Sequence, residues 1–147
     1  SVRRNVNNDE TGRQGILPEG MSELTALTTL TLAGNNLEGS LFKSWSTLVN
    51  LEELKLSYNH LQGEIPEAFS ALTALTALDL SWNKLSGNIP QAFTTTIQTL
   101  SLSNNAFDGR IPPHLALPSL IDLGLDFNSF TGAIPSTFTR LTGVSSL

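Results

Sequence analysis

The chain contains no cysteine among its 147 residues. Disulfides, zinc-thiolate sites and thiol nucleophiles are therefore excluded. Charged side chains are scarce, at 14% of residues, and 13 acidic against 8 basic side chains give a formal net charge of -5. This acidic balance argues against nucleic-acid binding, because phosphate recognition depends on clustered lysine and arginine. With 39% hydrophobic residues, the composition is still that of a folded chain rather than a disordered one.

Long apolar runs are also missing. No stretch approaches the roughly 20 residues that a membrane-spanning helix needs, and no apolar segment follows Arg3 and Arg4 as it would in a secretory signal peptide. The two histidines, His60 and His114, have no nucleophile, carboxylate or metal-ligand motif at a matching position. We therefore expect no enzyme activity, no cofactor, no metal site, no nucleic-acid partner and no membrane insertion by this segment.

What the sequence does contain is one motif repeated five times. The first copy reads Leu27-x-x-Leu30-x-Leu32-x-x-Asn35-x-Leu37-x-Gly39. The asparagines of successive copies are Asn35, Asn59, Asn83, Asn105 and Asn128, at intervals of 24, 24, 22 and 23 residues. A period of this length is the sequence signature of a solenoid, in which each repeat packs against its neighbours.

Each part of the motif has a physical role. The Leu-x-Leu core places two side chains on one face of a short strand, which is stabilised by pairing with the same strand of the next copy. The asparagine stands where the chain leaves the strand, and its amide can bond backbone groups that the turn leaves unpaired. A Gly-x-Ile-Pro segment then returns the chain across the far side. A second apolar row is expected there, made of Met21, Trp45, Phe69, Phe93, Leu115 and Phe138.

The repeats divide the chain into a short N-terminal segment and a repeat domain. Residues 1–14 are either a tail or a degenerate N-terminal cap, and residues 15–147 form the repeat domain. The domain consists of a half repeat at 15–26, repeats at 27–50, 51–74, 75–96, 97–119 and 120–143, and the start of a further repeat at 144–147. Because a solenoid needs polar caps, we expect a fragment of a longer protein, or self-association that covers an uncapped end.

These motifs resemble the leucine-rich repeat family over roughly residues 15–147, and specifically its plant-specific subclass with the pattern LxxLxLxxNxLxGxIPxxLxxLxxL. The resemblance implies an α/β solenoid, curved and right-handed, with short parallel inner strands and extended or 3-10 outer segments. The subclass occurs in ectodomains of plant receptor-like kinases and receptor-like proteins and in polygalacturonase-inhibiting proteins. Related repeats occur in surface antigens of kinetoplastid parasites.

The sequence departs from this pattern in several places. Phe42 replaces the proline of the Gly-x-Ile-Pro segment in the first full repeat. The third repeat is two residues shorter around 94–96, and the fourth is one residue shorter near 117–118. Both losses fall on the outer side, so they should alter local curvature and leave the inner strands intact. The cysteine-paired caps of secreted members and any Asn-x-Ser/Thr glycosylation acceptor are absent.

The variable positions of each strand point outward and are where a binding site is expected. Because adjacent strands lie about 4.8 Å apart, Tyr58 and Trp82 should be neighbours, with Phe127 two strands further on. The predicted binding residues are these three rings and a charged rim, namely Tyr58, Trp82, Phe127, Glu53, Lys55, Asp79, Asp122 and Asp126. The alternative is that the rings only pack over the turns and that the charges form a solvated face.

The resemblance implies a non-enzymatic recognition module, which binds a protein or peptide on the inner strand face of a cell-surface or secreted receptor-like protein. One alternative is a structural or surface-antigen spacer without a single ligand, and another is an inhibitor of a secreted glycan-degrading enzyme. Ice binding, known for some plant proteins of this class, requires a regular column of threonine or asparagine that these strands lack. The resemblance places the protein outside the cell or at its surface, although the absence of cysteine also suits the cytoplasm.

Overall fold

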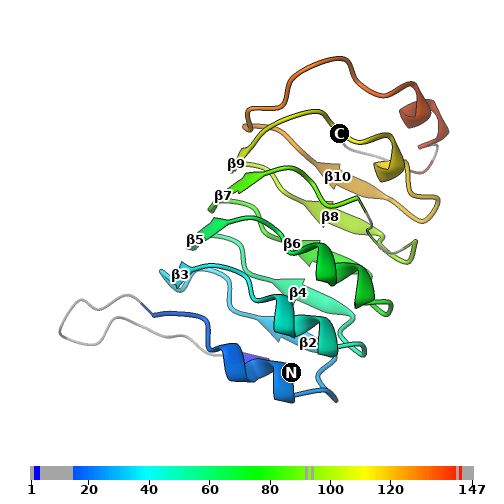
Figure 1. Cartoon of the computed structure of the whole chain (residues 1–147). Coiled ribbons are helices and arrows are strands. Elements are labelled where there is room, and N and C mark those ends of the chain that lie inside the picture. Colours follow the sequence, from blue (N-terminus) through cyan, green and yellow to red (C-terminus); the bar gives the residue numbers. More distant parts are fainter. Residues whose placement is uncertain (1, 4–14, 92, 94, 142, 144–147) are drawn as a thin grey trace.

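The computed structural model describes residues 2–3, 15–91, 93, 95–141 and 143. Six short strands form one parallel sheet in the order β1-β2-β4-β6-β8-β10 along the stack of repeats (Figure 1). Their bounds are β1 Val2–Arg3, β2 Thr29–Thr31, β4 Glu53–Lys55, β6 Ala77–Asp79, β8 Thr99–Ser101 and β10 Asp122–Gly124. The register sets Leu54 opposite both Leu30 and Leu78, so the motif leucines form one continuous row. The predicted solenoid with short parallel inner strands is confirmed.

The register of the inner sheet continues through the shortened repeats. Asp79 pairs with Ser101, and Ser101 pairs with Gly124. The prediction that the deletions leave the inner strands intact is therefore confirmed. At the N-terminal edge, β1 pairs in parallel with β2, with Val2 opposite Leu30. Residues 4–14, on which the choice between a tail and a degenerate cap depends, lie outside the described residues.

A second parallel sheet was not predicted from the sequence. Its order is β3-β5-β7-β9, with bounds Glu38–Gly39, His60–Gly63, Lys84–Gly87 and Ala106–Phe107. Each strand follows the motif asparagine, where the chain runs extended with its Leu or Phe in the core. A glycine closes the motif at each of these positions, and at Gly87 its φ of 76° is a left-handed conformation that side chains rarely adopt. An added Cβ there would also lie 2.7 Å from a Glu64 carboxylate oxygen.

Short 3-10 helices form the outer side of the repeats (Figure 1). Their bounds are η1 Glu19–Glu23, η2 Lys43–Thr47, η3 Glu67–Ala71, η4 Pro113–Leu115 and η5 Ser136–Arg140. A proline with fixed φ precedes four of them. Before η2, Phe42 adopts the same extended conformation and packs against Trp45 with ring centroids 6.2 Å apart. The predicted 3-10 segments are therefore confirmed.

One hydrophobic core fills the space between the inner strands and the outer helices. The second apolar row is buried as predicted at Met21, Trp45, Phe69, Phe93 and Leu115, whereas Phe138 is only partly buried. Burying one such side chain stabilises the fold by roughly 1.5–3 kcal/mol. The partial exposure of Phe138 has a simple cause, since no complete repeat packs on its far side within the described residues.

The motif asparagines form a buried hydrogen-bond ladder. Asn59 is 4% exposed, and its side chain contacts only backbone groups. Its Oδ1 accepts from the N–H groups of Asn35 and Leu37, and its Nδ2 donates toward the carbonyls of Leu32, Leu56 and Ser57, all within 2.9–3.2 Å. Asn83, Asn105 and Asn128 likewise donate toward three carbonyls, and each accepts from one N–H of the repeat before it. The predicted role of this asparagine is confirmed, and the contacts show that it ties each repeat to the one before it.

Candidate functional site

The residue before each ladder asparagine occupies a special backbone conformation. We call these five positions the ring column. Their φ angles are 70° at Gly34, 55° at Tyr58, 55° at Trp82, 57° at Asn104 and 53° at Phe127. All lie in the left-handed region, which costs roughly 1–2 kcal/mol for a residue with a bulky side chain. Sequence reasoning missed this conformation, although the glycine and asparagine in the column, the two residue types that tolerate it best, were a usable signal.

Backbone hydrogen bonds fix the spacing of the ring column. The N–H of Asn59 donates to the Trp82 carbonyl at 3.1 Å, and the N–H of Asn83 donates to the Asn104 carbonyl at 3.2 Å. The N–H of Asn105 continues the series to the Phe127 carbonyl at 3.2 Å. Each residue of the column is therefore one strand spacing from the next, about 4.8 Å.

The structure brings two of the three predicted rings together. Tyr58 and Trp82 stack with centroids 5.3 Å apart and an angle of 9° between their planes. Both remain accessible, at 59% and 50% exposure, and Phe127 is 77% exposed. The stack borders an open groove of about 480 Å³, whose lining includes Asn36, His60, Lys84 and Asn104. Large, rigid rings beside an open groove are the usual anchors of a protein interface.

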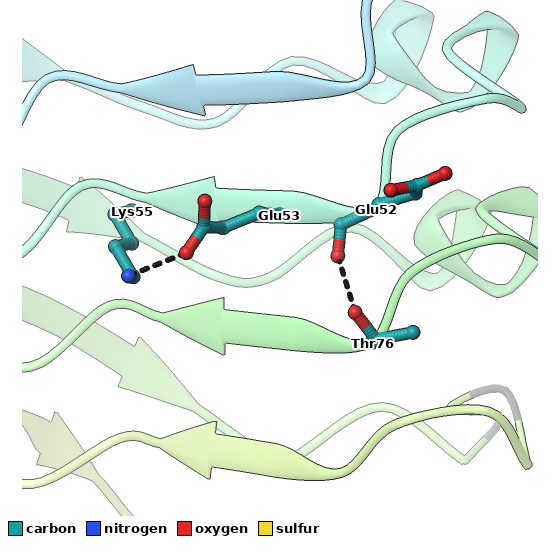
Figure 2. A network of polar contacts seen from close by, with 4 residues as sticks. All are labelled: Glu52, Glu53, Lys55 and Thr76. Carbon is teal, nitrogen blue, oxygen red and sulfur yellow. Dashed lines mark hydrogen bonds and ion pairs between the residues drawn. The ribbon is translucent and has the colours of Figure 1, made fainter.

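The predicted charged rim is only partly assembled. Glu53 and Lys55 form an ion pair within strand β4 (Figure 2). The same view shows Glu52 pointing its carboxylate away from this pair, while its backbone carbonyl accepts a 3.0 Å hydrogen bond from the Thr76 hydroxyl. Lys55 lies opposite Asp79 in register, yet its ammonium pairs with Glu53. The only lysine of the predicted site is thus already neutralised.

The other predicted acids form no ion pair among the described residues, and two of them accept hydrogen bonds from serines. Asp79 accepts hydrogen bonds from the N–H and the hydroxyl of Ser81, at 3.1 and 2.6 Å. Asp126 accepts a hydrogen bond from the Ser103 hydroxyl. Asp122 begins strand β10 and is exposed. Within the described residues, four carboxylates and one lysine of the predicted site therefore give the inner face a net negative charge.

The histidines do not form a site with one another. His60 lies in β5 at the edge of the groove, and His114 lies in η4 with its Nε2 2.9 Å from the Pro90 carbonyl. In the part of the chain that the structure describes, no three His, Asp or Glu residues are placed to hold a metal ion. None of the helices described there is long and apolar enough to cross a membrane.

Comparisons with known proteins place these features in context. A leucine-rich repeat family model matches residues 25–85, and a second leucine-rich repeat model matches residues 96–117. The LRR ectodomain of the receptor kinase SOBIR1 from Arabidopsis thaliana superimposes with a TM-score of 0.73 at 34% identity, over 83% of this chain and 68% of that chain. The comparison with curated protein sequences gives no significant match.

Two further solved structures differ in function from each other. The plant peptide hormone receptor RGFR1 in complex with RGF2 matches at 32% identity with a TM-score of 0.87, over 89% of this chain. A plant ice-binding protein matches at 36% identity with a TM-score of 0.80, over 86% of this chain and 42% of that chain. The present chain spans about a fifth of the length of the receptor, since it covers 22% of it.

Proposed function

The chain belongs to the leucine-rich repeat family, and on this premise we propose that its inner strand face is a non-enzymatic recognition surface for a protein or peptide. The observation that carries this proposal is the Tyr58–Trp82 stack, which is half exposed beside an open groove. We propose further that the segment belongs to a cell-surface or secreted receptor-like protein, because its structural relatives include a plant peptide hormone receptor and a receptor-kinase ectodomain.

The backbone conformation of the rings favours binding over simple packing on the turns. Glycine and asparagine stand at two positions of the ring column and avoid the strain that Tyr58, Trp82 and Phe127 accept. Exposure of 50% or more means that burial in this chain offsets little of that strain. Strained residues of this kind concentrate at functional sites such as ligand clamps.

An extended segment crossing the strands would meet an aromatic anchor and an acidic surface. Burying one ring of the stack against a partner can contribute about 2 kcal/mol to binding. The acids at positions 79, 122 and 126 would act mainly on the rate of association and on the choice of partner. The mode of recognition we propose is therefore an aromatic anchor with an electrostatic rim.

Ice binding has a structural relative but no matching surface here. A plant ice-binding protein shares the fold. The inner positions of successive strands nevertheless change from Thr31 to Lys55, Asp79, Ser101 and Gly124, so they present no regular array to an ice lattice. We expect no thermal hysteresis from this chain, and a measured hysteresis would overturn the recognition proposal in favour of ice binding.

Selection from a displayed library of 12-residue peptides tests the proposed recognition surface. We expect binders to be enriched on the wild-type chain and to lose at least tenfold in affinity on a Trp82→Asn variant with an unchanged melting temperature, because the ring is exposed. Asparagine is the matched replacement, since Asn104 occupies the same backbone conformation. Failure to enrich any peptide would instead favour the spacer alternative.

A fluorescence readout can follow the same site directly. The chain has two tryptophans, of which Trp45 is fully buried and Trp82 is half exposed. Replacing Trp45 by phenylalanine, the residue in the equivalent slot at Phe69, leaves Trp82 as the sole indole. A selected peptide that binds the proposed surface should then shift or quench the emission of Trp82.

A further inference from the structure

The ring column is interrupted at one position between two exposed rings. Trp82, Asn104 and Phe127 are consecutive members of the column, joined by the backbone hydrogen bonds of the asparagine turns. Asn104 has no ring, so the stack that begins with Tyr58 and Trp82 stops there. The next ring, Phe127, stands one step beyond the interruption.

The interruption has the width of one planar group. The one ring-to-ring step that the column contains, Tyr58 to Trp82, measures 5.3 Å between centroids. Two steps of about 4.8 Å therefore separate Trp82 from Phe127. Stacked planar groups lie with centroids about 4.5–7 Å apart, so a plane at the position of Asn104 would lie at stacking distance from both neighbours.

An open groove borders this interruption on the side of Trp82. The 480 Å³ groove beside the Tyr58–Trp82 stack extends as far as Asn104. A second hollow of about 350 Å³ is lined by Asp126 and Phe127 together with residues of the last repeat such as Ile134, and it does not include Asn104. The position between the rings can therefore be reached from solvent.

Charge decides which planar group fits. Among the described residues, the inner strands and the turns that follow them carry Glu53, Asp79, Asp122 and Asp126, against Lys55, which is already paired with Glu53. Lys84 of β7 also lines the groove, so the acids still outnumber the lysines by four to two. Asp126 immediately precedes Phe127, and the one partner assigned to its carboxylate among the described residues is the neutral hydroxyl of Ser103. A cationic plane at this position would therefore have an aromatic residue of the column on each side and an accessible carboxylate nearby.

We propose that this interruption binds the guanidinium group of an arginine in the partner peptide, stacked between Trp82 and Phe127 and hydrogen-bonded to Asp126. Arginine alone among side chains combines a plane that stacks on aromatic rings with a permanent positive charge and several donors. Lysine supplies the charge without the plane, and phenylalanine supplies the plane without the charge. The inference rests on the proposed peptide-binding function and names the residue that the surface recognises.

Peptide selection followed by matched substitutions tests the inference. Arginine should be enriched among 12-residue peptides selected on the wild-type chain, and replacing that arginine by lysine should weaken binding about tenfold. In the protein, Asn104→Phe should fill the interruption with a ring and weaken the arginine peptide by at least tenfold. The left-handed backbone at 104 accepts a ring in the same conformation at Phe127.

Ala106→Phe is the control. It adds the same ring to an exposed residue of β9, outside the ring column, and should leave the affinity within threefold. Melting curves show whether both variants are folded. If Asn104→Phe does not fold, the loss of affinity on replacing the peptide arginine by lysine, measured on the wild-type protein, tests the inference instead. Peptides enriched without arginine, or an arginine peptide that binds Asn104→Phe as well as wild type, would overturn the inference while the proposed function stands. Failure to enrich any peptide would overturn both.

Discussion

Asn59 and Tyr58 are neighbours in the sequence and share one turn, but one side chain is buried and hydrogen-bonded while the other is exposed to solvent. The asparagine is 4% exposed and its amide is bonded entirely to backbone groups of two repeats. The tyrosine is 59% exposed and contacts the ring of the following repeat. One residue therefore holds the repeats together, and the residue before it is presented to solvent.

The difference explains which positions repeat and which vary within the chain. The asparagines at 59, 83, 105 and 128 each accept from a backbone N–H of the preceding repeat and donate toward three carbonyls, a combination that only an amide of this size supplies. The ring column meets mainly solvent, and its members range from glycine to tryptophan. Variation at a strained and exposed position, next to an invariant buried one, is what a recognition surface on a rigid scaffold requires.

The largest effect should come from removing a central member of the ladder. Asn59→Ala leaves two N–H groups and up to three carbonyls of the turn without their partners in a buried site. Since each buried polar group left unpaired costs about 1–3 kcal/mol, we expect the free energy of unfolding to fall by about 3–5 kcal/mol. Chemical denaturation measures this loss, and a change below about 1 kcal/mol would contradict the role assigned to the ladder.

A smaller loss is expected at the last member of the ladder. Asn128 makes the same kind of bonds, to the N–H of Phe107 and to the carbonyls of Leu102, Leu125 and Asp126. Its side chain is only half-buried, so water can replace part of the lost bonding, and Asn128→Ala should cost about 1–2 kcal/mol. Equal losses at positions 59 and 128 would show that burial does not set the strength of the ladder.

The buried half of this comparison could be predicted from the sequence, and the exposed half could be predicted only in part. The repeat period and the residue type place Asn59 in a buried turn, because the same environment recurs in every repeat and asparagine recurs with it. The left-handed backbone of Tyr58 has a weaker signal in the sequence, namely the glycine and asparagine at the equivalent positions 34 and 104. Strand β5 and its sheet were missed because an extended run with one buried leucine has no periodicity of its own.

The charged rim shows a different limit. Sequence columns place Lys55 beside Asp79 on adjacent strands, and the register confirms that the two are opposite each other. The ammonium nevertheless pairs with Glu53 of its own strand. The choice between two carboxylates depends on side-chain rotamers, which no spacing in the sequence encodes.

A third prediction concerns the ring column itself, where two replacements of Trp82 separate strain from stacking. Trp82→Asn loses the contact with Tyr58, worth about 0.5–1.5 kcal/mol, but relieves left-handed strain of about 1–2 kcal/mol. We expect its free energy of unfolding to equal or slightly exceed that of the wild type. Trp82→Ala loses the same contact without the tolerance of asparagine, and should be less stable than Trp82→Asn by about 1 kcal/mol. Thermal and denaturant unfolding of both variants provide the measurement. A Trp82→Ala variant more stable than Trp82→Asn would contradict the strain assigned to the left-handed backbone.

The smallest effect should come from the ion pair on the inner face. Lys55→Gln removes the partner of Glu53 at a part-exposed site, where such a pair contributes about 0–1 kcal/mol. The free energy of unfolding should therefore change by less than about 0.5 kcal/mol, and this small difference should vanish in 0.5 M salt because exposed charges are screened. The affinity for a cationic peptide should rise at low salt, because the variant leaves the inner face more acidic. Unchanged or weaker binding of such a peptide would mean that the acids of this face do not select the partner, and the aromatic anchor would then act alone.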